Sequence, residues 1–107
     1  MNNLFHIENI DFSKNEEITE ILASSKNVRI ERIVSTGQVT ASDFWYDQPE
    51  TEFVTVLQGD AKILFDNGKE IHLTQGDYLT IPAHCRHKVS YTSAEPACVW
   101  LVVFYKS

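Results

Sequence analysis

The chain has 107 residues, of which 43% are hydrophobic and 22% charged, and this composition predicts one globular domain. The formal net charge of −6 and the pI near 5.0 argue against nucleic acid and anionic membranes as partners, because both repel an acidic surface. The N-terminus lacks the basic and apolar regions of a secretory signal, and no apolar run approaches the roughly 20 residues of a membrane helix. We therefore expect a cytoplasmic protein, in which Cys85 and Cys98 are free thiols.

The first part of the chain is predicted to contain one short helix. Ser13 and Glu16 have the spacing of a capping box, in which a hydroxyl at the helix N-terminus is followed three residues later by Glu. Ile18, Ile21 and Leu22 then follow at helical spacing. We expect residues 1–27 to form an arm with this helix, packed on a domain formed by residues 28–107.

The rest of the chain has the pattern of short β-strands separated by turns. Asn67-Gly68 between two apolar runs is a strong signal for a hairpin, because both turn positions require positive φ. Strands at intervals of roughly ten residues are typical of a sandwich or barrel. The predicted strands are residues 28–35, 51–58, 61–66, 69–74, 78–82, 87–93 and 98–105.

The last of these strands, residues 98–105, is apolar on both faces, whereas a strand at a protein surface usually alternates. One face belongs to the core. The outer face of such a strand in a small barrel usually meets another subunit, so we expect a homodimer.

The spacing of several residues resembles the motifs of the cupins, which are small double-stranded β-helix, or jelly-roll, proteins. The second cupin motif is matched by Gly76, Pro82 and His87, with His84 where the motif has Gly and Tyr91 where it has Asn. The end of the first motif is matched by a Glu and a Gly with six residues between them, at positions 52 and 59. The resemblance implies an all-β cupin barrel. It covers roughly residues 28–105, nearly the whole domain, but implies no particular reaction, because this fold hosts many activities.

In cupins that bind metal, two His and a Glu of the first motif and the His of the second hold one divalent ion. Glu52 and His87 occupy two of these places, but the two His of the first motif are missing. The loop before Glu52 is longer than the pattern requires, so its register is open, and Asp47 or Gln48 could supply an oxygen ligand. Such a His-plus-oxygen site would favour Mn, Fe, Zn or Ni.

Three function classes remain open at this point, and in the last of them the barrel is purely structural, in a stress or assembly protein. In the first, the protein is a metal-dependent enzyme, such as an oxidoreductase or isomerase, acting on a small polar substrate, with His84 or Tyr91 transferring protons. In the second, it is a metal-free barrel that binds or senses a small molecule, and Glu52 and His87 simply pair with each other. The aromatic run of Phe44, Trp45 and Tyr46 lies beside the first motif, and we expect it to line the mouth of the pocket in either case.

Overall fold

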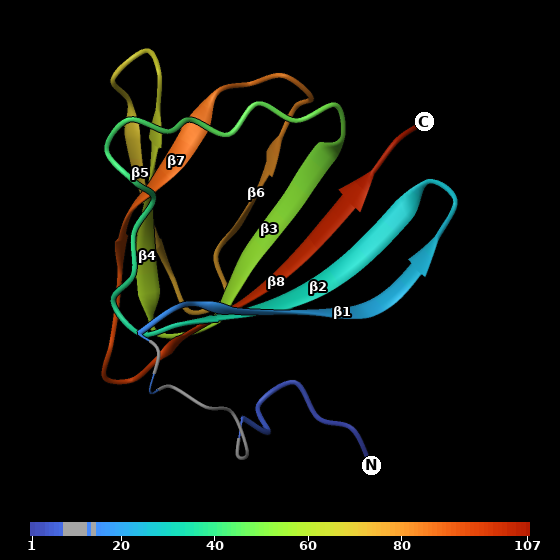
Figure 1. Ribbon diagram of the computed structural model, residues 1–107, viewed down its shortest axis with the longest axis vertical. Helices are drawn as coiled ribbons and strands as arrows, with labels where there is room; N and C mark the ends of the chain where they lie inside the picture. The colour runs from blue at the N-terminus through green and yellow to red at the C-terminus, as the bar shows by residue number, and fades with distance from the viewer. Residues whose placement is uncertain (8–12, 14) are drawn as a thin grey trace.

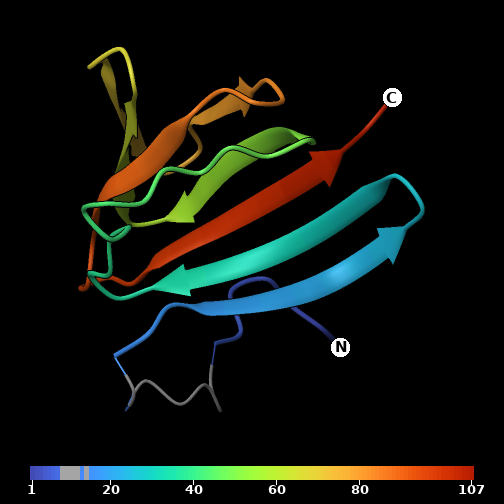
Figure 2. The same ribbon diagram turned by 45° about the horizontal axis from the view of Figure 1, so that its top comes forward.

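The computed structural model describes residues 1–7, 13 and 15–107. These residues form two antiparallel sheets that face each other, as in the predicted double-stranded β-helix (Figures 1 and 2). The larger sheet has the order β1-β2-β8-β3-β6, and the smaller has the order β5-β4-β7. The strands are β1 (Ile18–Ser25), β2 (Val28–Ser35), β3 (Thr51–Gln58), β4 (Asp60–Phe65), β5 (Glu70–Thr74), β6 (Tyr78–Ile81), β7 (His87–Thr92) and β8 (Cys98–Tyr105).

The predicted N-terminal helix is wrong. Residues 18–25 form strand β1, which pairs with β2 along its length from Ile18↔Val34 to Ser25↔Val28. Helical spacing is a weak local preference, and here the backbone hydrogen bonds to an adjacent strand outweigh it. Lys14, inside the predicted capping box, lies outside the described residues. Among the described residues, none belongs to a helix long and apolar enough to cross a membrane.

The turns that connect the strands follow the glycine signals of the sequence. Gly68 has a φ of 88° and its N–H donates to the Phe65 carbonyl, so Asn67-Gly68 lies in the turn of the predicted β4–β5 hairpin. Asn67 itself does not have a positive φ, so the turn is not of the expected kind with two positive φ values. Gly59, between β3 and β4, has a φ of 77° and is closely surrounded. A Cβ atom at this position would stand 2.3 Å from Ser93 Oγ and 2.9 Å from the Ala97 carbonyl oxygen. Glycine is therefore required here both by conformation and by space.

The core fills the closed end of the space between the sheets. Its fully buried members include Val54, Val56 and Ile63, together with Cys98 and Val102 from β8. Both cysteines are free thiols, as predicted from the sequence, but their environments differ. Cys98 is fully buried, whereas Cys85 is partly accessible.

The burial of Cys98 predicts selective labelling of the native protein. Desolvation, with a smaller effect of the Asp60 charge, raises the pKa of the Cys98 thiol to about 12. Because the thiolate is the reactive form, we expect iodoacetamide at mildly alkaline pH to alkylate Cys85 and leave Cys98 intact. Mass spectrometry of peptides from native and guanidinium-unfolded protein measures this. Equal labelling of Cys98 in the two states would contradict the buried placement.

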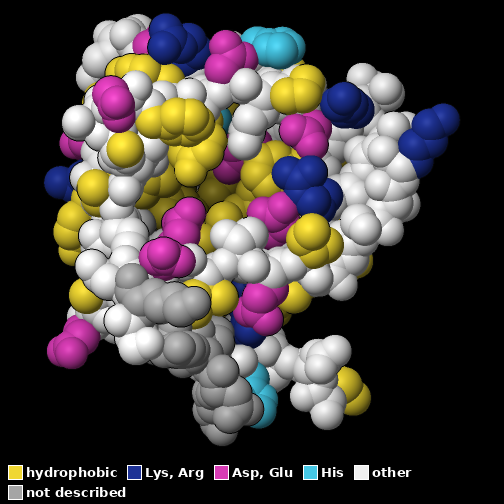
Figure 3. Space-filling model, in the orientation of Figure 1, with side chains coloured by type: hydrophobic (Ala, Val, Ile, Leu, Met, Phe, Trp, Pro, Cys, Tyr) yellow, Lys and Arg dark blue, Asp and Glu magenta, His cyan; other side chains and the backbone are white. Residues whose placement is uncertain are grey.

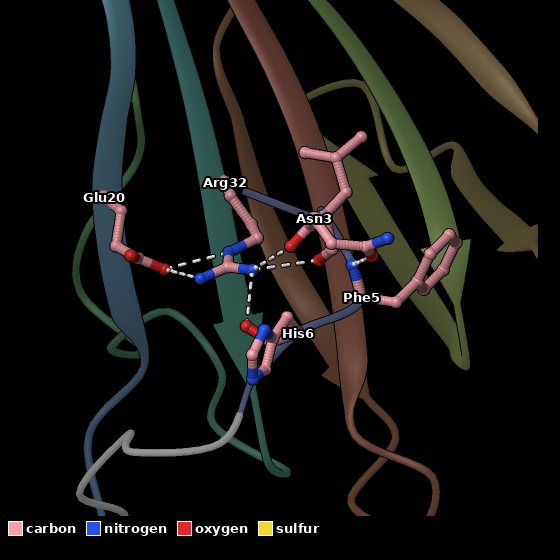
Figure 4. Close-up of polar contacts among 6 residues, drawn as sticks. Asn3, Phe5, His6, Glu20 and Arg32 are labelled. Atoms are coloured by element: carbon pink, nitrogen blue, oxygen red, sulfur yellow. Dashed lines mark hydrogen bonds and ion pairs between the residues drawn. The ribbon is translucent and has the colours of Figure 1, made fainter. Parts of the chain in front are cut away.

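The N-terminal segment lies on the outer side of the larger sheet, where Arg32 holds it (Figure 4). The Arg32 guanidinium, buried on β2, donates to the carbonyl oxygens of Asn3 at 3.3 Å, Leu4 at 3.0 Å and His6 at 3.1 Å. Its Nε also donates to Glu20 of β1 at 2.9 Å. One side chain therefore joins the two strands and the first residues of the chain.

The remainder of this outer face carries apolar side chains. Register places Ile30, Phe53 and Val103 side by side on β2, β3 and β8, and each of them is half-buried. Tyr78 of β6 is 67% exposed and its ring lies 5.4 Å from that of Phe53. The larger sheet thus presents an apolar surface on the side away from the core.

Candidate functional site

A cavity of about 220 Å³ lies between the two sheets and opens to solvent. Its floor is apolar and acidic side chains surround its mouth (Figure 3). The inward-facing residues of β2, β3 and β8 form one wall, and those of β4 and β7 form the other, because alternate residues of a strand face the same side. The lining residues are Glu17, Thr19, Arg29, Glu31, Ile33, Tyr46, Gln48, Glu52, Val54, Ile63, His87, Val89, Trp100, Val102 and Phe104.

Glu52 and His87 meet across this cavity. His87 Nε2 lies 3.3 Å from Glu52 Oε1, and the imidazole is nearly buried, with 4% of the residue exposed. The other ring nitrogen, Nδ1, lies 2.9 Å from the Cys85 carbonyl oxygen. A carbonyl oxygen can only accept, so Nδ1 carries a proton and the orientation of the ring is fixed. Nε2 is thereby directed at the carboxylate.

These contacts favour the protonated form of His87. Burial is the largest single influence and disfavours the imidazolium, but the hydrogen bonds to Glu52 and to the Cys85 carbonyl, with the Glu52 charge, outweigh it and raise the pKa of His87. Both ring nitrogens face acceptors, which agrees with this direction. The pair can therefore hold a proton at His87 Nε2 beside a carboxylate that can receive it.

A second charged group lies on the β2 side of the cavity. Arg29 donates from Nε to Glu31 on the same face of β2, and from Nη1 to Glu50 at 3.1 Å. Its guanidinium carbon lies 4.4 Å from the centre of the Phe104 ring. Arg29 is consequently held by two carboxylates and an aromatic face, and it covers part of the cavity mouth.

Glu17 and Tyr46 line the opposite part of the mouth. Partial desolvation raises the pKa of the Glu17 carboxyl, against the effect of the hydrogen bond from Ser35. Burial and the nearby charges of Glu17 and Glu52 raise the pKa of the Tyr46 phenol, against a hydrogen bond with Thr40. Tyr46 thus stays protonated at neutral pH and can donate a hydrogen bond into the cavity.

The loop before β3 has a defined register, which the sequence left open. Tyr46 and His87 exchange backbone hydrogen bonds of 2.8 and 3.1 Å, so the loop is locally an additional strand beside β7. Alternation then directs Tyr46 and Gln48 to the cavity and Asp47 to the other side. Asp47 Oδ1 instead lies 2.8 Å from His84 Nδ1.

His84 and Tyr91 lie outside the cavity lining. His84 adopts a φ of 61° at the position where the motif has Gly, and its side chain is 69% exposed. Tyr91 is 40% exposed and pairs with Lys62. From simple alternation Tyr91 should share the face of His87, but a bulge in β7 after Val89 reverses the sides of the following residues.

The three aromatic residues of the loop have different surroundings. Tyr46 lines the cavity, and Phe44 packs edge-on against it with ring centres 5.1 Å apart, while remaining 49% exposed. Trp45 lies outside the cavity lining, with Lys88 Nζ 4.3 Å and Arg86 Cζ 5.7 Å from its ring centre. Only Tyr46 of the three therefore contributes to the cavity wall.

Comparison with known proteins agrees with the geometry. The sequence profile described as "Cupin domain" matches residues 32–104, more than half of the chain. The chain belongs to the cupin family. Among proteins with curated functions, none matches it significantly.

Solved cupin-like structures superpose on this cupin over nearly its whole length. A protein from Ralstonia eutropha JMP134, named "putative mannose-6-phosphate isomerase", has a TM-score of 0.90 and 37% identity, covering 100% of this chain and 98% of that chain. A cupin superfamily protein from Desulfitobacterium hafniense DCB-2 has a TM-score of 0.76 at 24% identity, covering 92% and 84% of the two chains. An RmlC-like cupin from Desulfovibrio desulfuricans has a TM-score of 0.70 at 20% identity, covering 98% and 96%. The latter two similarities concern the fold alone.

The donor set of this cupin fits a divalent metal only in part. His87 has the anchoring that a metal ligand usually has, with Nδ1 on a carbonyl and Nε2 directed into the cavity beside Glu52. Gln48 could add an amide oxygen. Over residues 1–7, 13 and 15–107, however, no three or more His, Cys, Asp or Glu side chains converge on one point. Catalytic zinc-type sites usually have three such ligands, so we assign no chemical step to a metal here.

Three charged lining residues were not predicted from the sequence. Arg29 and Glu31 alternate with apolar residues in a predicted strand, and such charged residues on an inward face could have indicated a polar cavity. Glu17 had no comparable signal, because the segment that carries it was expected to be helical.

Proposed function

We propose that this cupin binds a small polar molecule in the cavity, with Glu52 and His87 as the groups that contact its reactive or polar end. The observation that carries the proposal is a nearly buried Glu–His pair on the wall of a solvent-connected cavity whose floor is apolar. Such a combination of apolar walls and few directed polar groups is typical of small-molecule sites. Proton transfer at His87 Nε2 is the chemistry that this pair supports.

A melting-temperature screen of small polyols, amines and carboxylic acids tests the proposal. A ligand at one hundred times its Kd stabilises the native state by about 2.7 kcal/mol, which raises the melting temperature by several degrees in a domain of this size. We expect at least one compound to do so for the natural sequence and not for His87→Ala. The matched control is His72→Ala, because His72 is exposed and pairs with Asp60 away from the cavity. Equal shifts in His87→Ala, or no shift with any compound, would refute the proposal.

A divalent metal held by Glu52, His87 and Gln48 is the second candidate, and the anchored His87 Nδ1 is the observation that favours it. The metals are Mn, Fe, Zn or Ni, and the ion would act as a Lewis acid when bound. Because two strong donors hold an ion weakly, we expect any metal retained during chelator-free purification to be lost on dialysis against EDTA. Elemental analysis of the natural sequence and of His87→Ala decides, since an unchanged metal content in the variant would exclude this site.

We also propose a homodimer formed through the apolar outer face of the larger sheet. Ile30, Phe53 and Val103 lie there side by side and half-buried, and Tyr78 is mostly exposed. Light scattering should give about twice the chain mass of 12.3 kDa. Phe53→Glu should reduce this to the monomer mass, whereas Val39→Glu, an exposed apolar position in the loop after β2, should not. A monomeric natural sequence would contradict the proposal.

A further inference from the structure

The charges that line the cavity do not balance. Glu17, Glu31 and Glu52 contribute three carboxylates, whereas Arg29 is the one Lys or Arg among the described lining residues. His87 adds one positive charge in its protonated form. The lining is therefore negative whichever form His87 takes, and the acidic rim is visible around the hollow in Figure 3.

The two positive groups are already engaged. Arg29 binds Glu31 and also Glu50, a further carboxylate beside the cavity. His87 is directed at Glu52 on one side and at the Cys85 carbonyl on the other. An anion entering the cavity would have to displace these carboxylates from their partners while it faced the remaining ones.

One of the three carboxylates, that of Glu17, has no charged partner among the contacts of the described lining residues. The donor to Glu17 is the neutral Ser35 hydroxyl at 3.4 Å, and partial desolvation already raises the pKa of the Glu17 carboxyl. Glu17 and Glu52 both line the cavity, and the charges of both act on the Tyr46 phenol. A cation in the cavity would gain from both charges.

Aromatic surfaces add a second interaction suited to cations. The guanidinium of Arg29 already covers the Phe104 ring, so this aromatic face is occupied by a cation of the chain itself. Tyr46 and Trp100 also line the cavity.

We infer that the cavity takes a small organic cation, such as a protonated amine, and rejects anionic ligands such as sugar phosphates. The inference rests on the proposed function of the cavity as a ligand site, and it specifies the ligand class. The inferred ligand class differs from the phosphorylated sugar in the name of the Ralstonia relative. A phosphorylated substrate requires cationic groups that are not already paired with carboxylates.

Butylamine, butanol and butyrate test the inference, because they have the same length and differ in the charge of one end. The two tryptophans provide the readout through their indole N–H signals in ¹⁵N-labelled protein. Trp100 lines the cavity, whereas Trp45 lies outside it between Arg86 and Lys88 and reports general surface effects. We expect butylamine to shift Trp100 but not Trp45 and to bind about tenfold more tightly than butyrate, as a charge-assisted contact implies.

Glu17→Gln should weaken butylamine binding about fivefold, because it removes one charge and keeps the shape. Asp66→Asn, which removes the same charge in the β4–β5 turn, should leave the binding unchanged. Butyrate binding as strong as butylamine binding, or equal effects of the two variants, would overturn the inference while the proposed binding function stood. Failure of all three compounds to shift Trp100 would refute the proposed function itself, and the inference with it.

Discussion

Gly59→Ala should lower the free energy of unfolding by about 3 kcal/mol, which is a large part of the total for a domain of this size. Two effects combine. The φ of 77° is unfavourable for any residue with a Cβ, and that Cβ would stand 2.3 Å from Ser93 Oγ and 2.9 Å from the Ala97 carbonyl. The Ser93 hydroxyl could rotate away, but Ala97 presents backbone, so the segment before β8 would have to move. Urea unfolding followed by circular dichroism measures the change.

Gly76→Ala is the matched control for this substitution. Gly76 has a φ of 89°, nearly the same as Gly59, but no atom lies within 4 Å of the position of its missing Cβ. The control therefore carries the conformational cost of about 1 kcal/mol without the steric one. Similar losses in the two variants would show that the close packing around Gly59 does not determine the stability.

Arg32→Ala should lower the free energy of unfolding by about 2–3 kcal/mol and release the N-terminal segment from the sheet. The guanidinium binds three carbonyl oxygens of residues 3–6 as well as Glu20, and it is buried. The substitution also removes the packing of the aliphatic part of the Arg32 side chain on the outer face of β2. We expect chymotrypsin to cut after Phe5 much faster in the variant, because a protease requires an unfolded segment.

Arg29→Ala is the control for Arg32→Ala, since it removes the same residue type from the same strand but from the opposite, cavity-facing side. Cleavage near Phe5 should remain as slow as in the natural sequence. If both variants were cut at equal rates, the N-terminal segment would not depend on Arg32, and the loss would be a general effect of lower stability.

Most of the barrel could be predicted because its signals are local. Alternating apolar residues and turns that contain glycine indicated the strands from β2 to β8. The spacing of Gly76, Pro82 and His87 indicated the cupin family. Strand β1 could not be predicted in this way. Its residues have helical spacing, and it becomes a strand because the edge of β2 offers hydrogen bonds along its length, which is a tertiary effect.

The candidate site could be predicted only where a side chain direction follows from an unbroken strand. Glu52 and His87 lie at the starts of β3 and β7, before the irregularity in each strand, and do line the cavity. Tyr91 follows a bulge, whose extra residue leaves no trace in the residue types, and so its direction could not be read. The choice between Asp47 and Gln48 depended on the backbone pairing of Tyr46 with His87, which joins residues 41 positions apart.

The backbone pairing of Tyr46 with His87 also affects the tendency of the protein to aggregate through its sheet edges. β7 is the last strand of its sheet, and a terminal strand with free backbone groups can recruit a strand from another molecule. Here the loop between β2 and β3 forms backbone hydrogen bonds with β7. Tyr46 pairs with His87, and the Thr40 N–H donates to the Val89 carbonyl. Strand β7, which carries His87, is thereby shielded from intermolecular β-sheet growth, so the same loop that directs Gln48 into the cavity also protects this cavity wall from aggregation.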